Sequence, residues 1–127
     1  YTPLIELISD ILTPWEKVKS IISNFDVRVE ITHTDSFKIN LTRILQEVIT
    51  NIIKHAEAKK IEVRLRQTES SLIIVIEDNG VGFDTQKNIK GLGLTNIETR
   101  VKYLKGHYKV KSTKSKGTTN LFFFNMK

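Results

Sequence analysis

Apolar residues recur at helical spacing at the start of the chain, over residues 4–12. Thr13 and Pro14 follow directly and supply an N-cap and a first-turn proline. They predict a second helix that ends at Ser23. The chain is therefore expected to open with two helices that are separated by a break.

A longer periodic segment predicts an amphipathic helix over about residues 40–58. Its apolar residues fall on one side of a helical wheel, which is the side expected to face a core. They are Leu45, Val48, Ile49, Ile52, Ile53 and Ala56. Glu47, Asn51 and Lys54 fall on the other side, and His55 lies at its margin.

Alternation of apolar and polar residues with a period of two predicts strands in the rest of the chain. The predicted strands are residues 27–32, 61–66, 72–76, 108–113 and 118–125. Residues 72–76 are apolar at every position, as expected of a central strand, and Thr68 to Ser71 form the turn before it. Residues 94–104 predict a helix that is ended by Gly106. Residues 78–93 contain four glycines and no apolar periodicity, which predicts a functional loop.

The composition is that of a single globular domain. The 127 residues are 39% apolar and 27% charged, which argues against disordered and repeat proteins. Its longest aliphatic run, residues 72–76, is too short to cross a bilayer. The absence of cysteine excludes disulfide scaffolds, thiolate metal sites and cysteine nucleophiles, and it suits the cytosol. Because the chain opens at Tyr1, we expect it to be a piece of a longer protein.

The charge pattern favours an anionic partner. The chain has 20 basic and 14 acidic residues, a net charge of +6, which suits phosphate, nucleic acid or a lipid surface. On the predicted helix over residues 40–58, Glu47, Asn51 and Lys54 stack a carboxylate, an amide and an ammonium along one stripe. This set suits a phosphate with a hard divalent cation. The alternative is a solvated helix face.

Two glycine-rich segments suit a nucleotide. Residues 78–82, Asp-Asn-Gly-Val-Gly, directly follow the apolar strand, so their glycines can approach a flat ligand while Asp78 accepts from an exocyclic amine. Residues 91–94, Gly-Leu-Gly-Leu, directly precede a predicted helix, whose N-terminus attracts phosphate. Each segment alone also suits an ordinary turn. The P-loop pattern is absent, so a nucleotide would be held without it.

Together and in this order, these features resemble the catalytic ATP-binding domain of bacterial two-component sensor histidine kinases, in the superfamily shared with DNA gyrase, Hsp90 and mismatch-repair ATPases. The similar stretches are residues 47–56 (N box), residues 78–83 (G1 box), residues 91–94 with Asn96, Ile97 and Arg100 (G2 box and its helix), and Gly117 with Thr118 (last pocket motif). Residues 54–56 and the short segment 84–90 most resemble the kinases that act with LuxR/NarL-type regulators.

The resemblance implies an α/β fold of the Bergerat type. This is a two-layer sandwich with a mixed sheet of about five strands, covered on one face by helices, and ATP lies between the helices and a mobile lid. The implied cofactors are ATP and Mg²⁺, with Asn51 as the Mg²⁺ ligand, Asp78 on the adenine amino group and Glu47 as a base or polarising residue. The other implied site residues are Gly80, Gly82 and Thr118 at the adenine, and Lys54, His55, Gly91, Leu92, Gly93 and Leu94 at the phosphates.

The implied activity is transfer of the γ-phosphoryl of Mg·ATP to a histidine on a dimerisation domain absent from this chain, for relay to a response regulator. His33 and His107 lack the adjoining acid of the acceptor motif, and His55 belongs to the N box. The phosphoacceptor domain, the sensor domain and any membrane segments are therefore expected upstream, in a homodimeric parent. Residues 1–24 are expected to be a helical segment leading into a cytoplasmic ATP-binding domain of residues 25–127.

Two other functions remain open. A serine kinase of the anti-sigma-factor type has the same fold and would phosphorylate serine. A basic module for nucleic acid or a partner protein, with a degenerate nucleotide pocket, is the other. Nucleic acid is not expected, because the lysines of residues 109–116 lack interleaved aromatic residues and instead predict a solvated hairpin edge. Trp15, Phe25 and residues 122–124 are expected to pack in the core, with a partner surface as the alternative.

Overall fold

The computed structural model describes residues 3–55, 57–82 and 94–126. Its helices are α1 (Leu4–Leu12), the 3₁₀ helix η1 (Thr13–Trp15), α2 (Asp35–His55) and α3 (Leu94–Tyr103). Its strands are β1 (Ser20–Val27), β2 (Lys60–Gln67), β3 (Ser71–Asp78), β4 (His107–Thr113) and β5 (Gly117–Asn125).

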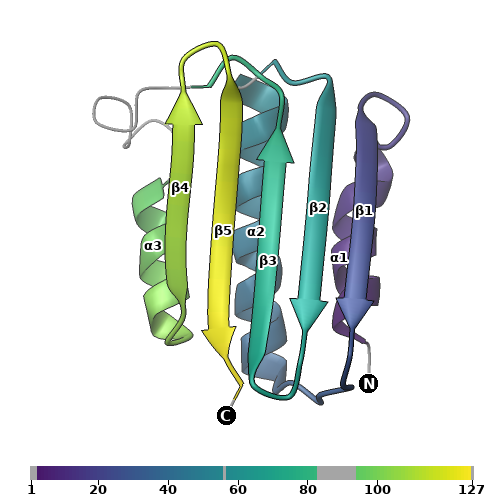
Figure 1. The fold of residues 1–127 in the computed structure, drawn as a ribbon, viewed down its shortest axis with the longest axis vertical. Coiled ribbons are helices and arrows are strands. Elements are labelled where there is room, and N and C mark those ends of the chain that lie inside the picture. Colours follow the sequence, from purple (N-terminus) through teal and green to yellow (C-terminus); the bar gives the residue numbers. More distant parts are fainter. Residues whose placement is uncertain (1–2, 56, 83–93, 127) are drawn as a thin grey trace.

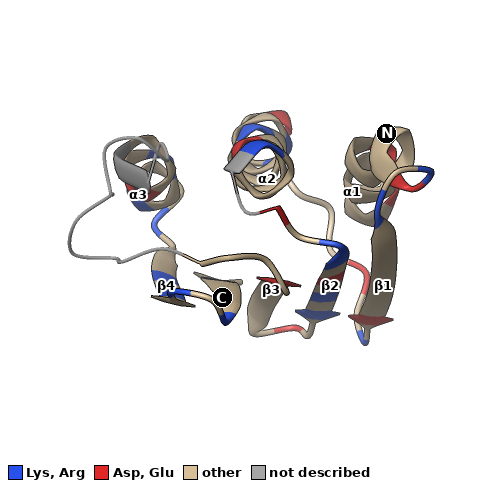
Figure 2. Cartoon of the chain, turned by 90° about the horizontal axis from the view of Figure 1, so that it is seen from above, with Lys and Arg blue, Asp and Glu red and all other residues tan. Residues whose placement is uncertain are grey.

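The strands form one mixed sheet with the order β1-β2-β3-β5-β4. β1 pairs with β2 in parallel, and the other neighbouring strands pair antiparallel. Figures 1 and 2 show the three α-helices on one face of the sheet, so that the described residues leave the other face uncovered. The predicted two-layer α/β fold, with a five-stranded mixed sheet, is confirmed.

The N-terminal region differs from the prediction of two helices. α1 forms as predicted, but Pro14 lies in the short helix η1, and residues 20–27 form β1 in place of a helix that ends at Ser23. The strand predicted over residues 27–32 is wrong beyond Val27, where β1 ends. The physical reason is long-range pairing, because β1 bonds along its whole length to β2, a partner forty residues away in the sequence. The division after residue 24 stays a prediction, and β1 runs across it.

α2 begins five residues earlier than the hydrophobic pattern predicts. Thr34 caps its first turn, since the Thr34 hydroxyl accepts a hydrogen bond from the N–H of Phe37 at 3.1 Å. The helix ends at His55, and Glu57 adopts a left-handed φ of 50° beyond it. The predicted apolar side packs on the sheet, with Ile53 partly buried and Ala56 outside the described residues. Its fully buried members are Leu45, Val48, Ile49 and Ile52.

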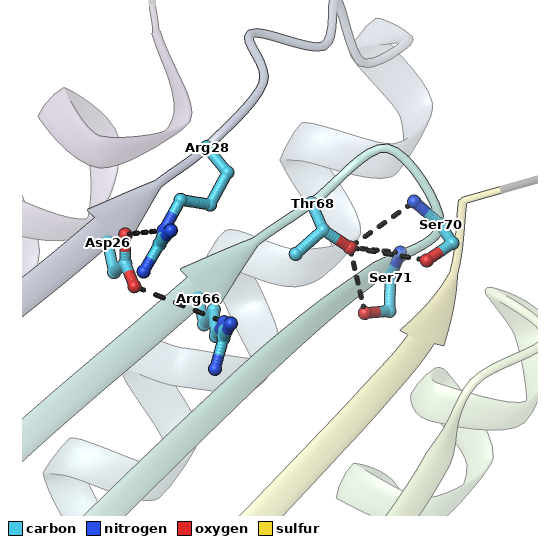
Figure 3. Close-up of polar contacts among 6 residues, drawn as sticks. All are labelled: Asp26, Arg28, Arg66, Thr68, Ser70 and Ser71. Atoms are coloured by element: carbon cyan, nitrogen blue, oxygen red, sulfur yellow. Dashed lines mark hydrogen bonds and ion pairs between the residues drawn. The ribbon is translucent and has the colours of Figure 1, made fainter.

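The predicted hairpins and the last helix form within one or two residues of their expected bounds. Thr68 organises the β2–β3 turn (Figure 3), because its N–H donates to the Ser71 carbonyl at 2.9 Å and its hydroxyl accepts from the N–H groups of Ser70 and Ser71. Past the end of α3, the Gly106 N–H donates to the Val101 carbonyl at 2.9 Å. Both turns tie consecutive elements together through local bonds.

The aromatic residues are mostly in the core, as predicted. Phe122 and Phe124 are fully buried between the sheet and the helices, and Trp15 and Phe25 pack against the same core. Phe123 is the exception, because it alternates to the other face of β5 and is 36% exposed. The lysines of residues 109–116 are exposed on the edge strand β4 and its turn, which confirms the predicted hairpin edge.

Candidate functional site

Asp78 is a buried carboxylate at the end of β3. Its residue is 8% exposed, and its Oδ1 accepts a hydrogen bond from the Gly80 N–H at 2.8 Å. Its Oδ2 is buried and has no hydrogen-bond partner among the residues that the structure describes. Burial raises the pKa of the Asp78 carboxyl, and the neighbouring backbone N–H groups of Gly80 and Thr118 act in the opposite direction. The molecule thus holds a buried acceptor that a ligand donor can satisfy.

Thr118 is the cross-strand neighbour of Asp78. It lies directly opposite Asp78 in the β3–β5 register and is 7% exposed. The Thr118 hydroxyl is 2.7 Å from the Ser112 hydroxyl of β4, which fixes its position. The structure therefore brings Thr118 next to Asp78, two residues that are separated by forty positions in the sequence.

Two glycines allow the loop after β3 to lie against the β4–β5 turn. Gly82 has a φ of +66°, and a Cβ there would lie 2.1 Å from the Thr113 carbonyl oxygen. Gly117 has a φ of +86°, and its Cβ would lie 2.1 Å from the Asp78 carbonyl oxygen. In addition, the Ser115 N–H donates to the Val81 carbonyl. Glycine is therefore required at both positions, for conformation and for space.

Asn79 has a structural role that the sequence does not reveal. Its Oδ1 accepts hydrogen bonds from the N–H groups of Lys59 and Lys60, both at 2.9 Å, so it ties the end of β3 to the start of β2. Its side chain is consequently occupied by the protein and is not a candidate ligand group. The distance in sequence of about twenty residues hides this contact from any local pattern.

Asn79→Ala is expected to lower the free energy of unfolding by about 1–3 kcal/mol, because each lost hydrogen bond contributes about 0.5–1.5 kcal/mol. Urea unfolding followed by circular dichroism measures this change. Asn79→Asp keeps the accepting oxygen and is the matched control, for which the loss should be smaller. Equal stability of Asn79→Ala and the unmodified chain would contradict this role.

One residue of the polar stripe on α2, Glu47, lies beside α3. Glu47 and Asn51 are half-buried one turn apart, and Lys54 is exposed. A hollow of about 240 Å³ opens between the two helices. Its lining includes Glu47 and Asn96, with two arginines, Arg43 and Arg100. The sequence analysis did not identify Arg43 as a candidate site residue. Its position one turn before Glu47 on the same helix could have indicated it.

The last turn of α2 lies at the same end of the sheet as the end of β3 and the start of β5. In Figure 1 the last turn of α2, the end of β3 and the β4–β5 turn lie at the top of the molecule, and α3 starts lower down. Of the other predicted site residues, Gly80 is buried next to Asp78. Gly91, Leu92 and Gly93 lie outside the described residues, as do the side chains of His55 and Leu94.

The donor set at this end fits a magnesium ion that arrives with phosphate. The described residues hold no cluster of three carboxylate, histidine or cysteine side chains that would bind a metal by protein groups alone. Mg²⁺ takes oxygen ligands and usually keeps waters and phosphate oxygens. One amide oxygen from Asn51, with Glu47 one turn away, suits that mode of binding.

Comparison with known proteins decides the family. A family model described as "Histidine kinase-, DNA gyrase B-, and HSP90-like ATPase" matches residues 37–127. The chain belongs to this family. Among the members similar to it is the sensor histidine kinase ComP of Bacillus subtilis (strain 168), which is 35% identical over 83 residues, 63% of this chain and 11% of ComP.

Another similar member of the ATPase family is the signal transduction histidine-protein kinase/phosphatase DegS of Brevibacillus brevis. It is 37% identical over 83 residues, 65% of this chain and 22% of DegS. The chain thus spans between a tenth and a quarter of the length of these relatives. It corresponds to the ATP-binding catalytic domain of sensor histidine kinases.

The fold agrees with that of a solved histidine kinase structure. The structure of the Acinetobacter baumannii histidine kinase AdeS superposes with a TM-score of 0.76 at 21% identity, covering 98% of this chain and 65% of that one. The order of strands and the single helical layer are therefore those of a histidine kinase catalytic domain. In the described part of the chain, no helix has the length and apolar character needed to span a membrane.

Proposed function

We propose that this chain binds Mg·ATP at the end of the sheet and supplies its γ-phosphoryl to a histidine of a phosphoacceptor domain in the same parent kinase. The observation that carries the proposal is the buried Oδ2 of Asp78, which has no hydrogen-bond partner within the described part of the chain. An exocyclic amine, such as that of adenine, is the donor that this acceptor requires. The family membership supports a nucleotide over other amines.

The residues of the site then have separate tasks. Asp78 and Thr118 bind and orient the base, while Gly82 and Gly117 keep the adjoining backbone in place. Lys54 attracts the triphosphate, and Asn51 holds the cation through its amide oxygen. A bound magnesium ion neutralises phosphate charge. Glu47 faces the hollow between α2 and α3, where it can accept a proton from, or polarise, the incoming acceptor side chain.

Histidine is the proposed acceptor, because the relatives reported above are named as histidine kinases. His33 does not fit this role, because it is 9% exposed and bonded to Gln67 at 2.7 Å and so belongs to the core. The acceptor domain is therefore proposed to lie elsewhere in a homodimeric, cytoplasmically exposed kinase. The proposed next recipient is a response regulator of the LuxR/NarL type.

Titration of the whole chain with a fluorescent ATP analogue, with and without Mg²⁺, tests the proposal. We expect saturable binding that Mg²⁺ strengthens by about tenfold. Asn51→Ala should remove the dependence on Mg²⁺, because the amide oxygen is the protein's contribution to the cation. Asn40→Ala is the matched control, because Asn40 lies three turns away on α2 and its side chain donates to the Ser36 carbonyl. This variant should keep the dependence of binding on Mg²⁺. Absence of binding, or an Mg²⁺ effect that survives Asn51→Ala, would reject the proposal.

Arg100→Ala is expected to weaken binding of ATP by about tenfold and to leave binding of ADP nearly unchanged. The reason is that Arg100 lines the hollow next to Glu47, where a terminal phosphate can reach its guanidinium. Competition of ATP and ADP against the fluorescent analogue measures both affinities. Lys102→Ala, an exposed cation of α3 outside that hollow, is the control. An equal loss for both nucleotides would contradict a contact with the terminal phosphate.

A further inference from the structure

The face of the sheet that the described helices leave uncovered carries a block of apolar side chains. Ile73 lies opposite Phe123, and Val75 lies opposite Leu121, in the register of β3 and β5. Leu121 and Phe123 are each 36% exposed, and Ile73 and Val75 are half-buried. These four residues are called the open-face stripe below.

The open-face stripe departs from the pattern of a solvated sheet face. Antiparallel sheets with one wet face alternate apolar residues inward and polar residues outward. β2 follows this rule with Arg64 and Arg66, and β4 follows it with Lys109 and Lys111. Cross-strand pairs on β3 and β5 stabilise the sheet, yet pairs of threonines or of opposite charges would do so as well. A contiguous apolar block with a polar border is typical of an interaction surface.

The charges on the two sides of the stripe differ. On the β1–β2 side, acids and arginines neutralise one another: Arg64 lies 3.3 Å from Glu62 and 2.5 Å from Glu77. Asp26 lies 2.7 Å from Arg28 (Figure 3), and this hydrogen bond lowers the pKa of the Asp26 carboxyl. This flank therefore has little charge left to offer a partner.

The β4 side of the stripe is positive. Lys109 lies opposite Leu121 and Lys111 opposite Thr119, both exposed, and no ion pair among the described residues reaches either lysine. The surface thus combines an apolar block with two cations along one border. Such a surface complements an apolar segment with acidic residues on the matching border.

We propose that an acidic amphipathic helix of a partner protein docks on the open-face stripe. The two apolar rows are two residues apart along the strands, about 7 Å at roughly 3.4 Å per residue. A helix places residues i and i+4 about 6 Å apart on one face. Its apolar residues therefore match the rows of the stripe, and carboxylates along one border reach Lys109 and Lys111.

A second copy of this chain fits the face less well. Two chains of net charge +6 repel each other, and a two-fold contact would bring the lysines of both copies to the same interface.

Docking of the helix is also independent of nucleotide binding. The stripe lies on the face of the sheet opposite the helices, whereas α2, which carries Asn51 and Glu47, lies in the helical layer (Figure 2).

Two designed helical peptides of about 18 residues, five turns, serve as probes. Both have leucine at i and i+4, and one carries glutamates along one border where the other carries lysines. Nuclear magnetic resonance titration of the labelled chain should show saturable shifts in β3, β4 and β5 with the acidic peptide, and about tenfold weaker binding of the basic one. Phe123→Thr, which keeps a strand-forming residue, should weaken binding of the acidic peptide by about tenfold. Lys109→Glu with Lys111→Glu should reverse the preference between the peptides.

The controls are an exposed apolar residue and an exposed cation in the helical layer. Ile39→Ser on α2 and Lys102→Glu on α3 should bind the acidic peptide as the unmodified chain does. Equal binding of both peptides, or shifts confined to the helices, would overturn the proposal. Concentration-dependent dimers that Phe123→Thr disperses would assign the face to a second copy instead. Binding to anionic phospholipid vesicles that depends on the stripe, without binding of the acidic peptide, would assign it to a membrane.

Discussion

Asp78→Asn is expected to weaken binding of ATP by about 100-fold or more, the largest effect on nucleotide affinity of any single change considered for this chain. The substitution keeps the shape of the side chain but replaces the buried acceptor Oδ2 by an N–H donor, which would face the donor amine of adenine. Titration with the fluorescent ATP analogue measures the loss. Glu77→Gln is the matched control, because it makes the same chemical change at the next residue, on the open face of the sheet. If Asp78→Asn bound the ATP analogue as tightly as the unmodified chain does, the proposed contact between Asp78 and adenine would be contradicted.

The same variant has a second expected signature, in the pH dependence of stability. Because burial raises the pKa of Asp78 above its unfolded value of 3.8, the folded chain holds this proton more tightly than the unfolded chain does. The stability of the unmodified chain should therefore fall as pH rises from that value through the folded pKa. Asp78→Asn lacks this loss, so its stability relative to the unmodified chain should be greater at about pH 7 than at about pH 4. Urea unfolding of both proteins at the two pH values measures the difference, and the opposite trend would contradict the raised pKa.

Gly117→Ala is expected to lower the free energy of unfolding by about 3 kcal/mol or more. The added Cβ would require a strained left-handed conformation and would overlap the carbonyl oxygen of Asp78, which is backbone and cannot move aside cheaply. Urea unfolding measures the loss, and the displaced end of β3 should weaken nucleotide binding at the same time.

Ser115→Gly, two residues earlier, is the control, for which the opposite change in stability is expected. Ser115 has a φ of 72° and an exposed side chain, so removing its Cβ relieves strain and should raise stability by about 1 kcal/mol. If both variants changed stability in the same direction, the argument from left-handed backbone would fail. If Gly117→Ala were as stable as the unmodified chain, the close approach to Asp78 would be disproved.

The elements that the sequence predicts well are those specified by local pattern. The apolar side of α2, from Leu45 to Ile52, is recognised from helical periodicity alone as the side that packs on the sheet. Residues 72–76 identify the central strand by their apolar character alone. The start of α2 was missed, because Thr34 caps the helix without a glutamate or glutamine three residues later to mark it.

Features that depend on distant partners could not be predicted in the same way. β1 lacks a regular alternation, since Ser23 stands where a fourth apolar residue would face the core, and its pairing with β2 decides its structure. At the site, spacing placed Asp78 at a strand end and Asn51 on a polar stripe. It could not show that Asn79 bonds to β2 or that Gly117 touches Asp78, since both contacts join residues far apart in the sequence.

The position of the β2–β3 turn has a practical consequence. Glu69 is exposed at its tip, and the length of β3 separates the turn from Asp78 by about 25 Å at roughly 3.4 Å per residue. Since the chain contains no cysteine, Glu69→Cys would provide a unique thiol for attaching a dye or tethering the domain to a surface. Single-molecule measurements could then follow events at the opposite end without labelling it.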